Sequence, residues 1–400
     1  MLLEKDQNPL NYLVRLFRRE TSSKEFIPVI DGLRFLAILL VVLFHASAYL
    51  EVKAKNLSFS DASLLGNNPP KIFEYGNQGV QLFFVISGFI LAIPFLRYYL
   101  GFVDSKIPLR KYFLRRLTRL EPPYILSLII LFFLTVFIAG SKYSLGMLIV
   151  SFFASTFYLH NFIFPGEFPY LNGVTWSLEV EVQFYILAPL LTWFICKFKN
   201  NNYRRIFTVL LIVLFSILAW LISEIWLIKT ISLANYLQYF LAGILLCDLY
   251  LSEKWENKAG RNFFSFIAGI VLFVLITCFS LVQSPNLILR IASPLLILSF
   301  YIIVFRNIWW KKLFSLNFLT LVGGMCYTIY LFHYHIISAV GRITVNRLFL
   351  SNYDLYFSIQ VIIYLAAILI FSAVYFLLIE KPCMARDWHI KLYKNFHSNN

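Results

Sequence analysis

The sequence predicts an all-α, polytopic integral membrane protein. Hydrophobic residues make up 60% of the 400-residue chain and charged residues only 14%, whereas soluble domains average about 45–50% apolar and about 25% charged residues. The mean hydropathy is +0.74, and the content of 42 Phe and 24 Tyr excludes a disordered chain. The five Cys are scattered without CxxC or metal-ligand spacing, so we expect no disulfide framework and no metal site.

Ten apolar stretches account for the predicted transmembrane helices. Each is close to the roughly 20 residues that a helix needs to cross the hydrocarbon core of a bilayer. They are residues 29–48, 79–98, 121–140, 178–196, 206–227, 232–250, 262–282, 288–305, 319–340 and 357–379. The second stretch contains Ser87-Gly88, a small pair that permits close helix approach. An eleventh stretch, residues 146–164, is interrupted by a histidine, an asparagine and several hydroxyl side chains.

The distribution of basic residues decides whether 146–164 spans the membrane. If it does not span and the N-terminus is cytoplasmic, 26 of the 35 Lys and Arg residues lie on the cytoplasmic side and eight on the outer side, as the positive-inside rule requires. If it spanned, every later loop would change sides and the basic segment 197–205 would face outward. We therefore expect ten spans, both termini in the cytoplasm, and a non-spanning or re-entrant segment on the outer side.

Three regions follow from this topology. Residues 1–24 lack the apolar core of a signal peptide, and four of their apolar side chains share one helical face beside several Arg residues, which indicates an amphipathic helix on the cytoplasmic leaflet. Residues 25–385 form the transmembrane domain, and residues 386–400 form a short cytoplasmic tail. Because topology explains the net charge of +15, we expect membrane lipids, and no nucleic acid, as partners.

Ionisable groups at membrane depth are the strongest functional signal, since each costs at least about 2.5–3.5 kcal/mol to insert. In the first span, eleven residues separate Arg34 from His45. At about 100° and 1.5 Å per residue, the two side chains share one helix face and lie about 16 Å apart. The predicted topology puts Arg34 near the cytoplasm and His45 near the outer side. The alternative is that Arg34 pairs with Asp31 and that His45 is a hydrogen-bonded interfacial histidine.

Two further elements carry charges into the membrane. Arg116 and Arg119 lie one helical turn apart at the start of the third span. Paired guanidinium groups suit phosphate or pyrophosphate recognition; the alternative is a topology anchor. Glu181 opens the fourth span from the outer side and lies deeper than Glu179, whose position is typical of an acid that favours the helix dipole.

A polar stripe follows one face of the ninth span. It consists of Tyr327, Tyr330 and His333. Because this span runs outward, we expect His333 at a depth similar to that of His45 and Glu181. There the Glu181 carboxylate can orient His45 or stabilise its cation.

These residues place phosphate-binding groups on the cytoplasmic side, and acid–base groups on the outer side, of one apolar interior. The arrangement suits a donor whose phosphorylated head stays at the cytoplasmic face while its reactive end reaches across the membrane. An acyl thioester of coenzyme A has this shape. A histidine that titrates near the working pH can take a proton from an acceptor hydroxyl.

Several ordered motifs resemble those of the membrane acyltransferase-3 family, of the O-antigen O-acetylase type. They are Asp31-Gly-Leu-Arg34 with His45, Phe84-Val-Ile-Ser87-Gly88-Phe, Arg116-x-x-Arg119, Trp176-Ser177-Leu-x-x-Glu181-x-x-Phe184-Tyr185 and Tyr327-x-x-Tyr330-Leu-x-His333. The resemblance covers about residues 28–385. It implies a fold of ten or so helices in the bacterial inner membrane. Such a protein moves acyl groups, commonly acetyl, from cytoplasmic acyl-CoA to extracytoplasmic saccharides such as O-antigen, lipopolysaccharide or exopolysaccharide.

The resemblance also implies roles for individual residues. His45 is expected to be the catalytic base or to carry the acyl group, with Glu181 and His333 as further catalytic residues. The expected donor-binding residues are Arg34, Arg116, Arg119, Ser87, Trp176 and Tyr330. No permanently bound cofactor is expected, because acetyl-CoA acts as a substrate. Some relatives append a periplasmic esterase-like domain; we expect this chain to lack one and to complete the transfer alone or with a separate partner.

A transporter or flippase of a glycolipid or anionic substrate is the alternative from another functional class. It would also use buried Arg, Glu and His residues. It would, however, move its substrate without covalent change and depend on a coupling ion. The sequence contains no internal repeat that would support the inverted-repeat architecture of many transporters.

Overall fold

The computed structural model describes residues 15–19, 26–55, 76–106, 108–140, 142–225, 231–253, 260–278, 285–348 and 350–385, together with residues 57, 73, 255 and 388. All regular elements within these ranges are helices, and Gly260 and Asn307 form an isolated bridge. The fold class predicted from the composition is therefore confirmed.

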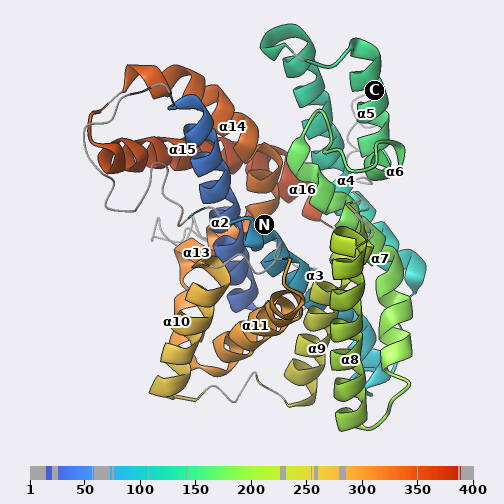
Figure 1. Ribbon diagram of the computed structural model, residues 1–400. Helices are drawn as coiled ribbons and strands as arrows, with labels where there is room; N and C mark the ends of the chain where they lie inside the picture. Colours follow the sequence, from blue (N-terminus) through green and yellow to red (C-terminus); the bar gives the residue numbers. More distant parts are fainter. Residues whose placement is uncertain are drawn as a thin grey trace, which may run out of the picture.

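The helices carry the labels of Figure 1. They are α2 (Pro28–Lys53), α3 (Gly79–Tyr99), α4 (Leu109–Leu134), α5 (Leu145–Thr156), α6 (His160–Ile163), α7 (Trp176–Ile195), α8 (Asn201–Trp220), α9 (Leu237–Ser252), α10 (Phe263–Cys278), α11 (Leu287–Arg306), α12 (Ile308–Phe314), α13 (Asn317–Gly324), α14 (Cys326–Arg347), α15 (Tyr353–Tyr375) and α16 (Lys381–Met384). Short π-helical turns extend α4 (Thr135–Ala139), α8 (Leu221–Ile225) and α15 (Phe376–Glu380), and 3-10 turns precede α3 (Gly76–Gln78), α7 (Gly173–Thr175) and α9 (Leu233–Asn235).

A helix lies over each of the ten predicted spans. Among the described residues, seven helices are long and apolar enough to cross a membrane by length and composition. They are α2, α3, α4, α7, α8, α11 and α15, most of them counted with their adjoining short turns. The helices α9 and α10 are apolar but have only 16 residues each. The chain is thus a helical membrane protein, while the number of crossings and the side of each terminus stay predictions.

The stretch 146–164 is not one spanning helix. It consists of α5, with 12 residues, and α6, with four. A turn at Tyr158, whose φ is +58°, separates the two helices. Twelve residues rise only about 18 Å, which is short of the roughly 30 Å hydrocarbon core. Neither helix alone is long enough to cross the core, and the expectation that this segment does not span the membrane stays a prediction.

The ninth predicted span, residues 319–340, is wrong as a continuous helix. It divides into α13 and α14 at Met325. At Gly323, α13 lies so close to the first turn of α2 that an added methyl group would overlap the carbonyl oxygen of Asp31. Helix propensity and hydropathy do not register this contact, so the sequence alone predicted one helix.

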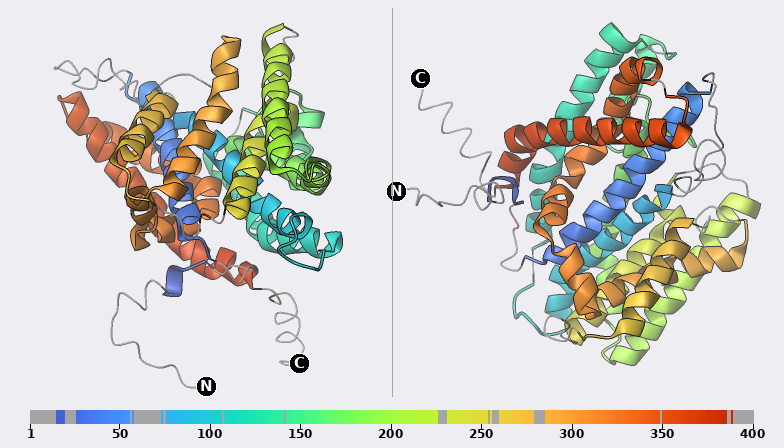
Figure 2. Two further views of the ribbon diagram at one scale, coloured as in Figure 1. Left: turned by 90° about the horizontal axis from the view of Figure 1, so that it is seen from below. Right: turned by 90° about the vertical axis from the view of Figure 1, so that its left-hand side faces the viewer.

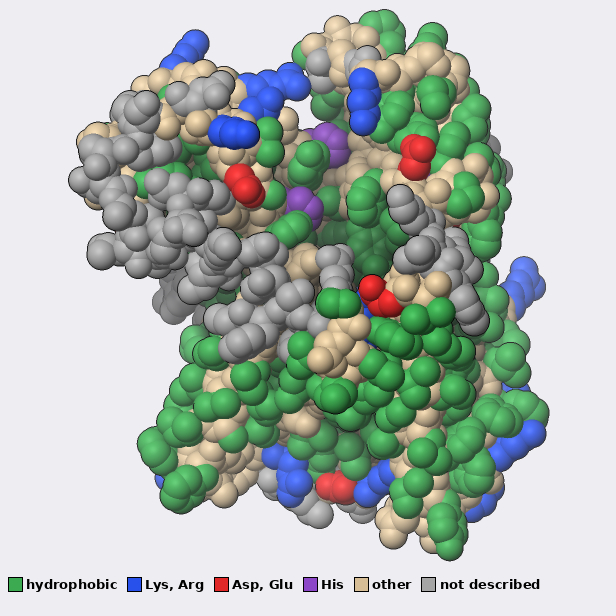
Figure 3. Space-filling model, viewed as in Figure 1, with side chains coloured by type: hydrophobic (Ala, Val, Ile, Leu, Met, Phe, Trp, Pro, Cys, Tyr) green, Lys and Arg blue, Asp and Glu red, His purple; other side chains and the backbone are tan. Residues whose placement is uncertain are grey.

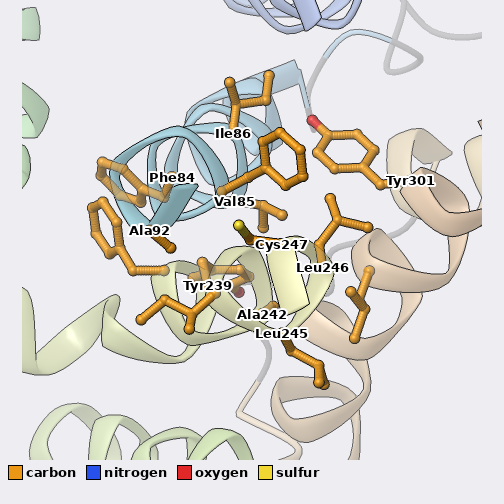
Figure 4. Close-up of a cluster of buried hydrophobic side chains, with 14 of the residues drawn as sticks. Phe84, Val85, Ile86, Ala92, Tyr239, Ala242, Leu245, Leu246, Cys247 and Tyr301 are labelled. Carbon is orange, nitrogen blue, oxygen red and sulfur yellow. The ribbon is translucent and has the colours of Figure 1, made fainter. Parts of the chain in front are cut away.

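Helices α3 and α9 pack closely against each other along their length. A methyl group on Gly88 would overlap the carbonyl oxygen of Phe240, and one on Gly243 would overlap that of Val85. Their side chains interdigitate with Tyr301 of α11 (Figure 4). The close approach predicted for the Ser87-Gly88 pair is confirmed, and it fixes the position of Ser87.

The N-terminal segment is described at residues 15–19, where 15–17 are helical. Phe17 packs partly buried against the cluster of α2, α14 and α15 side chains. The other three apolar residues of the predicted amphipathic face, Leu10, Leu13 and Val14, lie outside the described residues, as does most of the tail 386–400.

Figure 2 shows α15 crossing α2.

Candidate active site

His45 and His333 contact each other between α2 and α14. Their ring centroids are 5.0 Å apart, and Nε2 of His333 lies 3.3 Å from Nδ1 of His45. His333 is fully buried, whereas His45 is partly exposed. In the face shown by Figure 3, histidine side chains appear in a hollow between the part formed by α14 and α15 and the part formed by α5 and α6. The two histidines that were predicted to lie at a similar depth therefore touch each other, a contact that the sequence did not predict.

Backbone carbonyls determine the tautomers of this pair. Nδ1 of His45 lies 2.9 Å from the carbonyl oxygen of Val41, and Nδ1 of His333 lies 3.0 and 2.9 Å from the carbonyl oxygens of Ile329 and Tyr330. A carbonyl only accepts, so each Nδ1 carries the proton. Nε2 of His333 then accepts from Nδ1–H of His45. The Nε2 lone pair of His45 is consequently not used in either contact.

The polar stripe of α14 connects three neighbouring elements. Tyr327 donates to the carbonyl oxygen of Leu120 on α4 at 3.0 Å. Tyr330 donates to the carbonyl oxygen of Val174, before α7, at 2.7 Å, and its hydroxyl lies 3.0 Å from that of Ser177. His333, one turn further, contacts α2. Each residue of the stripe therefore holds a different part of the site against α14.

Glu181 lies with the arginines rather than with His45. Its carboxylate accepts hydrogen bonds from the hydroxyls of Ser87 and Tyr185, and it interacts electrostatically with Arg116. The expectation that Glu181 orients His45 is corrected by these contacts. The hydroxyl of Ser87 on α3, and not a ring nitrogen of His45 on α2, is its hydrogen-bond partner.

Arg116 stacks on aromatic rings. Its guanidinium carbon lies 3.8 Å from the ring centroid of Tyr112 and 5.8 Å from that of Tyr185, and Nη1 donates to the carbonyl oxygen of Tyr112 at 3.0 Å. Trp176, at the start of α7, instead packs against Phe84 and Tyr236 with centroids 6.4 and 5.2 Å away. Arg116 therefore belongs to the Glu181 cluster, and Trp176 lies in a separate aromatic group.

A second basic group surrounds the start of α2. Arg34 pairs with Asp31 at 2.6 Å, as the alternative interpretation expected, and Arg19 lies 3.7 Å from the same carboxylate. Arg119 interacts electrostatically with Asp31 and Glu380. The structure thus contains an ion-paired cluster at the start of α2 and a separate group of Arg116 with Glu181, and neither includes His45 or His333.

Sequence reasoning missed Glu380. Its buried carboxylate accepts from the backbone N–H of Thr328 at 3.2 Å and from its hydroxyl at 2.5 Å, beside Arg119. The available signal was an acid that directly ends an apolar run of more than twenty residues. It lies one residue beyond the predicted span 357–379, and no role was predicted for it from the sequence.

Comparison of the sequence with known proteins identifies relatives of this chain. A family model described as an acyltransferase domain matches residues 27–378. The peptidoglycan O-acetyltransferase OatA of Listeria monocytogenes serovar 1/2a is 26% identical over 410 residues, covering 96% of this chain and 60% of that protein. The O-acetyltransferase OatA of Staphylococcus aureus strain NCTC 8325 is 26% identical over 380 residues, covering 87% of this chain and 55% of that protein.

The chain spans less than two thirds of the length of these curated relatives. No solved structure matches it significantly. The family match extends from the residue before α2 to the π-helical turn after α15, and thus includes the histidine pair and the Arg34, Arg116 and Arg119 positions. The chain therefore belongs to the acyltransferase-3 family of membrane acyltransferases.

Proposed function

We propose that this protein is a membrane O-acyltransferase that moves an acetyl group from cytoplasmic acetyl-CoA to a hydroxyl of an extracytoplasmic glycan. The observation that carries the proposal is the Nε2 lone pair of His45, which the hydrogen bonds of the histidine pair leave available at a partly exposed position. Family membership supports acyl transfer.

The donor binds at the arginine clusters. Arg34, Arg116 and Arg119 supply guanidinium groups that recognise phosphate oxygens in pairs, and Ser87 lies beside them through its bond to Glu181. The three helical turns of α2 from Arg34 to His45 rise about 16 Å. An extended pantetheine arm can follow this path, with Trp176 and Tyr330 along its outer part.

The chemical step follows from the tautomers. Nε2 of His45 takes the proton of the acceptor hydroxyl, the hydroxyl oxygen attacks the thioester carbonyl, and the C–S bond breaks. The departing thiolate of coenzyme A then receives the proton from His45, so that an ester and free coenzyme A result. In the second route, Nε2 attacks the thioester carbonyl first, the C–S bond breaks, and coenzyme A departs as the thiolate. The acceptor oxygen then attacks the acetyl group on Nε2, the N–C bond breaks, and the hydroxyl proton is released to neutralise the thiolate. Only this route gives ping-pong kinetics.

The acceptor is an envelope glycan. The Listeria relative is a peptidoglycan O-acetyltransferase by name, so peptidoglycan joins O-antigen, lipopolysaccharide and exopolysaccharide as candidate acceptors. The site of action is the outer face of the bacterial plasma membrane, because the predicted topology puts His45 near that face.

Radiolabelled acetyl-CoA tests the proposal. Proteoliposomes with the purified chain are supplied with the labelled donor and with soluble peptidoglycan fragments or envelope polysaccharide. Base-labile label should enter the glycan, and His45→Ala should lower the rate by at least about 100-fold, in line with the loss of a general base. Unaltered transfer by folded His45→Ala protein would refute the assignment. Glycan that moves across the membrane without being esterified would indicate a flippase.

A further inference from the structure

Two buried guanidinium groups near the start of α2 have hydrogen-bond donors that the described part of the chain does not use. These are the Nε–H groups of Arg19 and Arg119, both shielded from solvent. The Arg19 side chain is only 11% exposed. A buried donor without an acceptor is costly, so this pair of donors is suited to an acceptor that a ligand provides.

The charges around these donors do not cancel. Arg19, Arg34 and Arg119 bring three positive charges, and the buried Asp31 and Glu380 bring two negative charges. Arg19 and Arg119 also repel each other electrostatically. Excess charge in a water-poor interior is unfavourable unless it is paired. The cluster therefore favours an anionic ligand.

We infer that Arg19, Arg34 and Arg119 together bind a phosphate group of the acyl-CoA donor, and that Arg19 is a donor-binding residue supplied by the N-terminal segment. Guanidinium groups match the oxygens of a phosphate ester in bidentate geometry. The cluster lies at the predicted cytoplasmic end of α2, where coenzyme A arrives. This inference rests on the proposed function and adds a residue from outside the family match, which begins at residue 27.

Lys381 holds this segment in place. Its Nζ donates to the carbonyl oxygens of Arg15 and Leu16 at 3.2 and 2.6 Å, both within the helical residues 15–17. Phe17 packs against the neighbouring apolar cluster. Lys381 directly follows Glu380, so the end of α15 positions both an acid of the cluster and the segment that carries Arg19.

The test measures binding of coenzyme A itself, by calorimetry, to the full-length protein in phosphatidylcholine nanodiscs. Arg19→Gln should weaken binding about tenfold, the loss of one charge-assisted hydrogen bond. Arg18→Gln is the matched control. It removes the same charge one residue away, but Arg18 is exposed and stacks on Phe26. We expect this control to change the dissociation constant less than twofold. Equal losses in both variants, or none in Arg19→Gln, would overturn the inference.

A double variant tests the role of the segment. Lys381→Met should weaken binding of coenzyme A as Arg19→Gln does, because it releases the segment. Lys381→Met combined with Arg19→Gln should bind no more weakly than Arg19→Gln alone, since both changes remove the same contact. Additive losses would contradict the proposed path through Lys381.

Anionic lipid is the other source of a phosphate ester, and the same assay separates it. Nanodiscs containing phosphatidylglycerol should not weaken coenzyme A binding to the wild-type protein. If they weaken it, and Arg19→Gln abolishes only that competition, the site belongs to a lipid headgroup and the inference fails. Arg19-dependent binding without any acetyl transfer would instead refute the proposed function and leave the binding site standing.

Discussion

His333 provides the sharpest test of the histidine pair. During transfer His45 becomes a cation, and its Nδ1–H bond to Nε2 of His333, 3.3 Å long, becomes charge-assisted. A bond to a charged group is worth about 1.5–3 kcal/mol, against about 0.5–1.5 kcal/mol for a neutral bond. His333 therefore favours the transition state over the ground state by about 1–1.5 kcal/mol, and losing it should lower kcat about tenfold.

Two variants of similar size separate this role from packing. His333→Leu removes the acceptor, and His333→Gln retains an oxygen that can accept from His45. We expect kcat for acetyl transfer to fall about tenfold in His333→Leu and less than threefold in His333→Gln, with the KM for acetyl-CoA unchanged in both. His335→Gln is the control, because His335 is bonded to the Leu171 carbonyl and not to His45. Equal kcat for the Leu and Gln variants, in protein that unfolds at the wild-type temperature, would refute the argument.

Three further changes test the packing and the arginines. Gly88→Ala should destabilise the protein by about 1–3 kcal/mol, since the added methyl group meets the Phe240 backbone. Gly146→Ala adds a methyl group in open space and should not destabilise the protein. The melting temperatures of the two variants test this difference. Asp248→Ala should lower the free energy of unfolding by about 3–5 kcal/mol, because it leaves the buried Arg204, bonded to Asp248 at 2.6 Å, without its carboxylate partner. Glu253→Ala, which breaks a partly exposed pair with Arg205, should lower it by less than about 1 kcal/mol. Equal melting temperatures of the two variants would contradict this expectation. Arg116→Lys loses the planar stack of the guanidinium group on Tyr112 and should raise the KM for acetyl-CoA several-fold. Arg115→Lys is the control and should leave this KM unchanged. A wild-type KM in Arg116→Lys would indicate that Arg116 is a topology anchor.

The sequence predicted features that depend on one helix at a time. Hydropathy located helical segments at each of the ten stretches, and the predicted topology put His45 and His333 at a similar depth. It did not predict the partner of Glu181, because periodicity gives the face of a residue on its own helix and not the register between helices. The register that matters here is the one between α3 and α7, which brings Ser87 beside Glu181. The ion pair of Arg34 with Asp31 was predictable, since both residues lie on adjacent turns.

The break between α13 and α14 links the two ends of the site. Gly323 faces α2 at Asp31, and His333 faces α2 at His45. Ten residues of continuous helix turn about 1000°, about 80° short of three full turns, so in an unbroken helix these two positions would point in different directions. The interruption at Met325 removes that constraint and allows both to face α2. The break that made the predicted ninth span wrong therefore lets one stretch of chain contact α2 both beside the arginine cluster and at the proposed base.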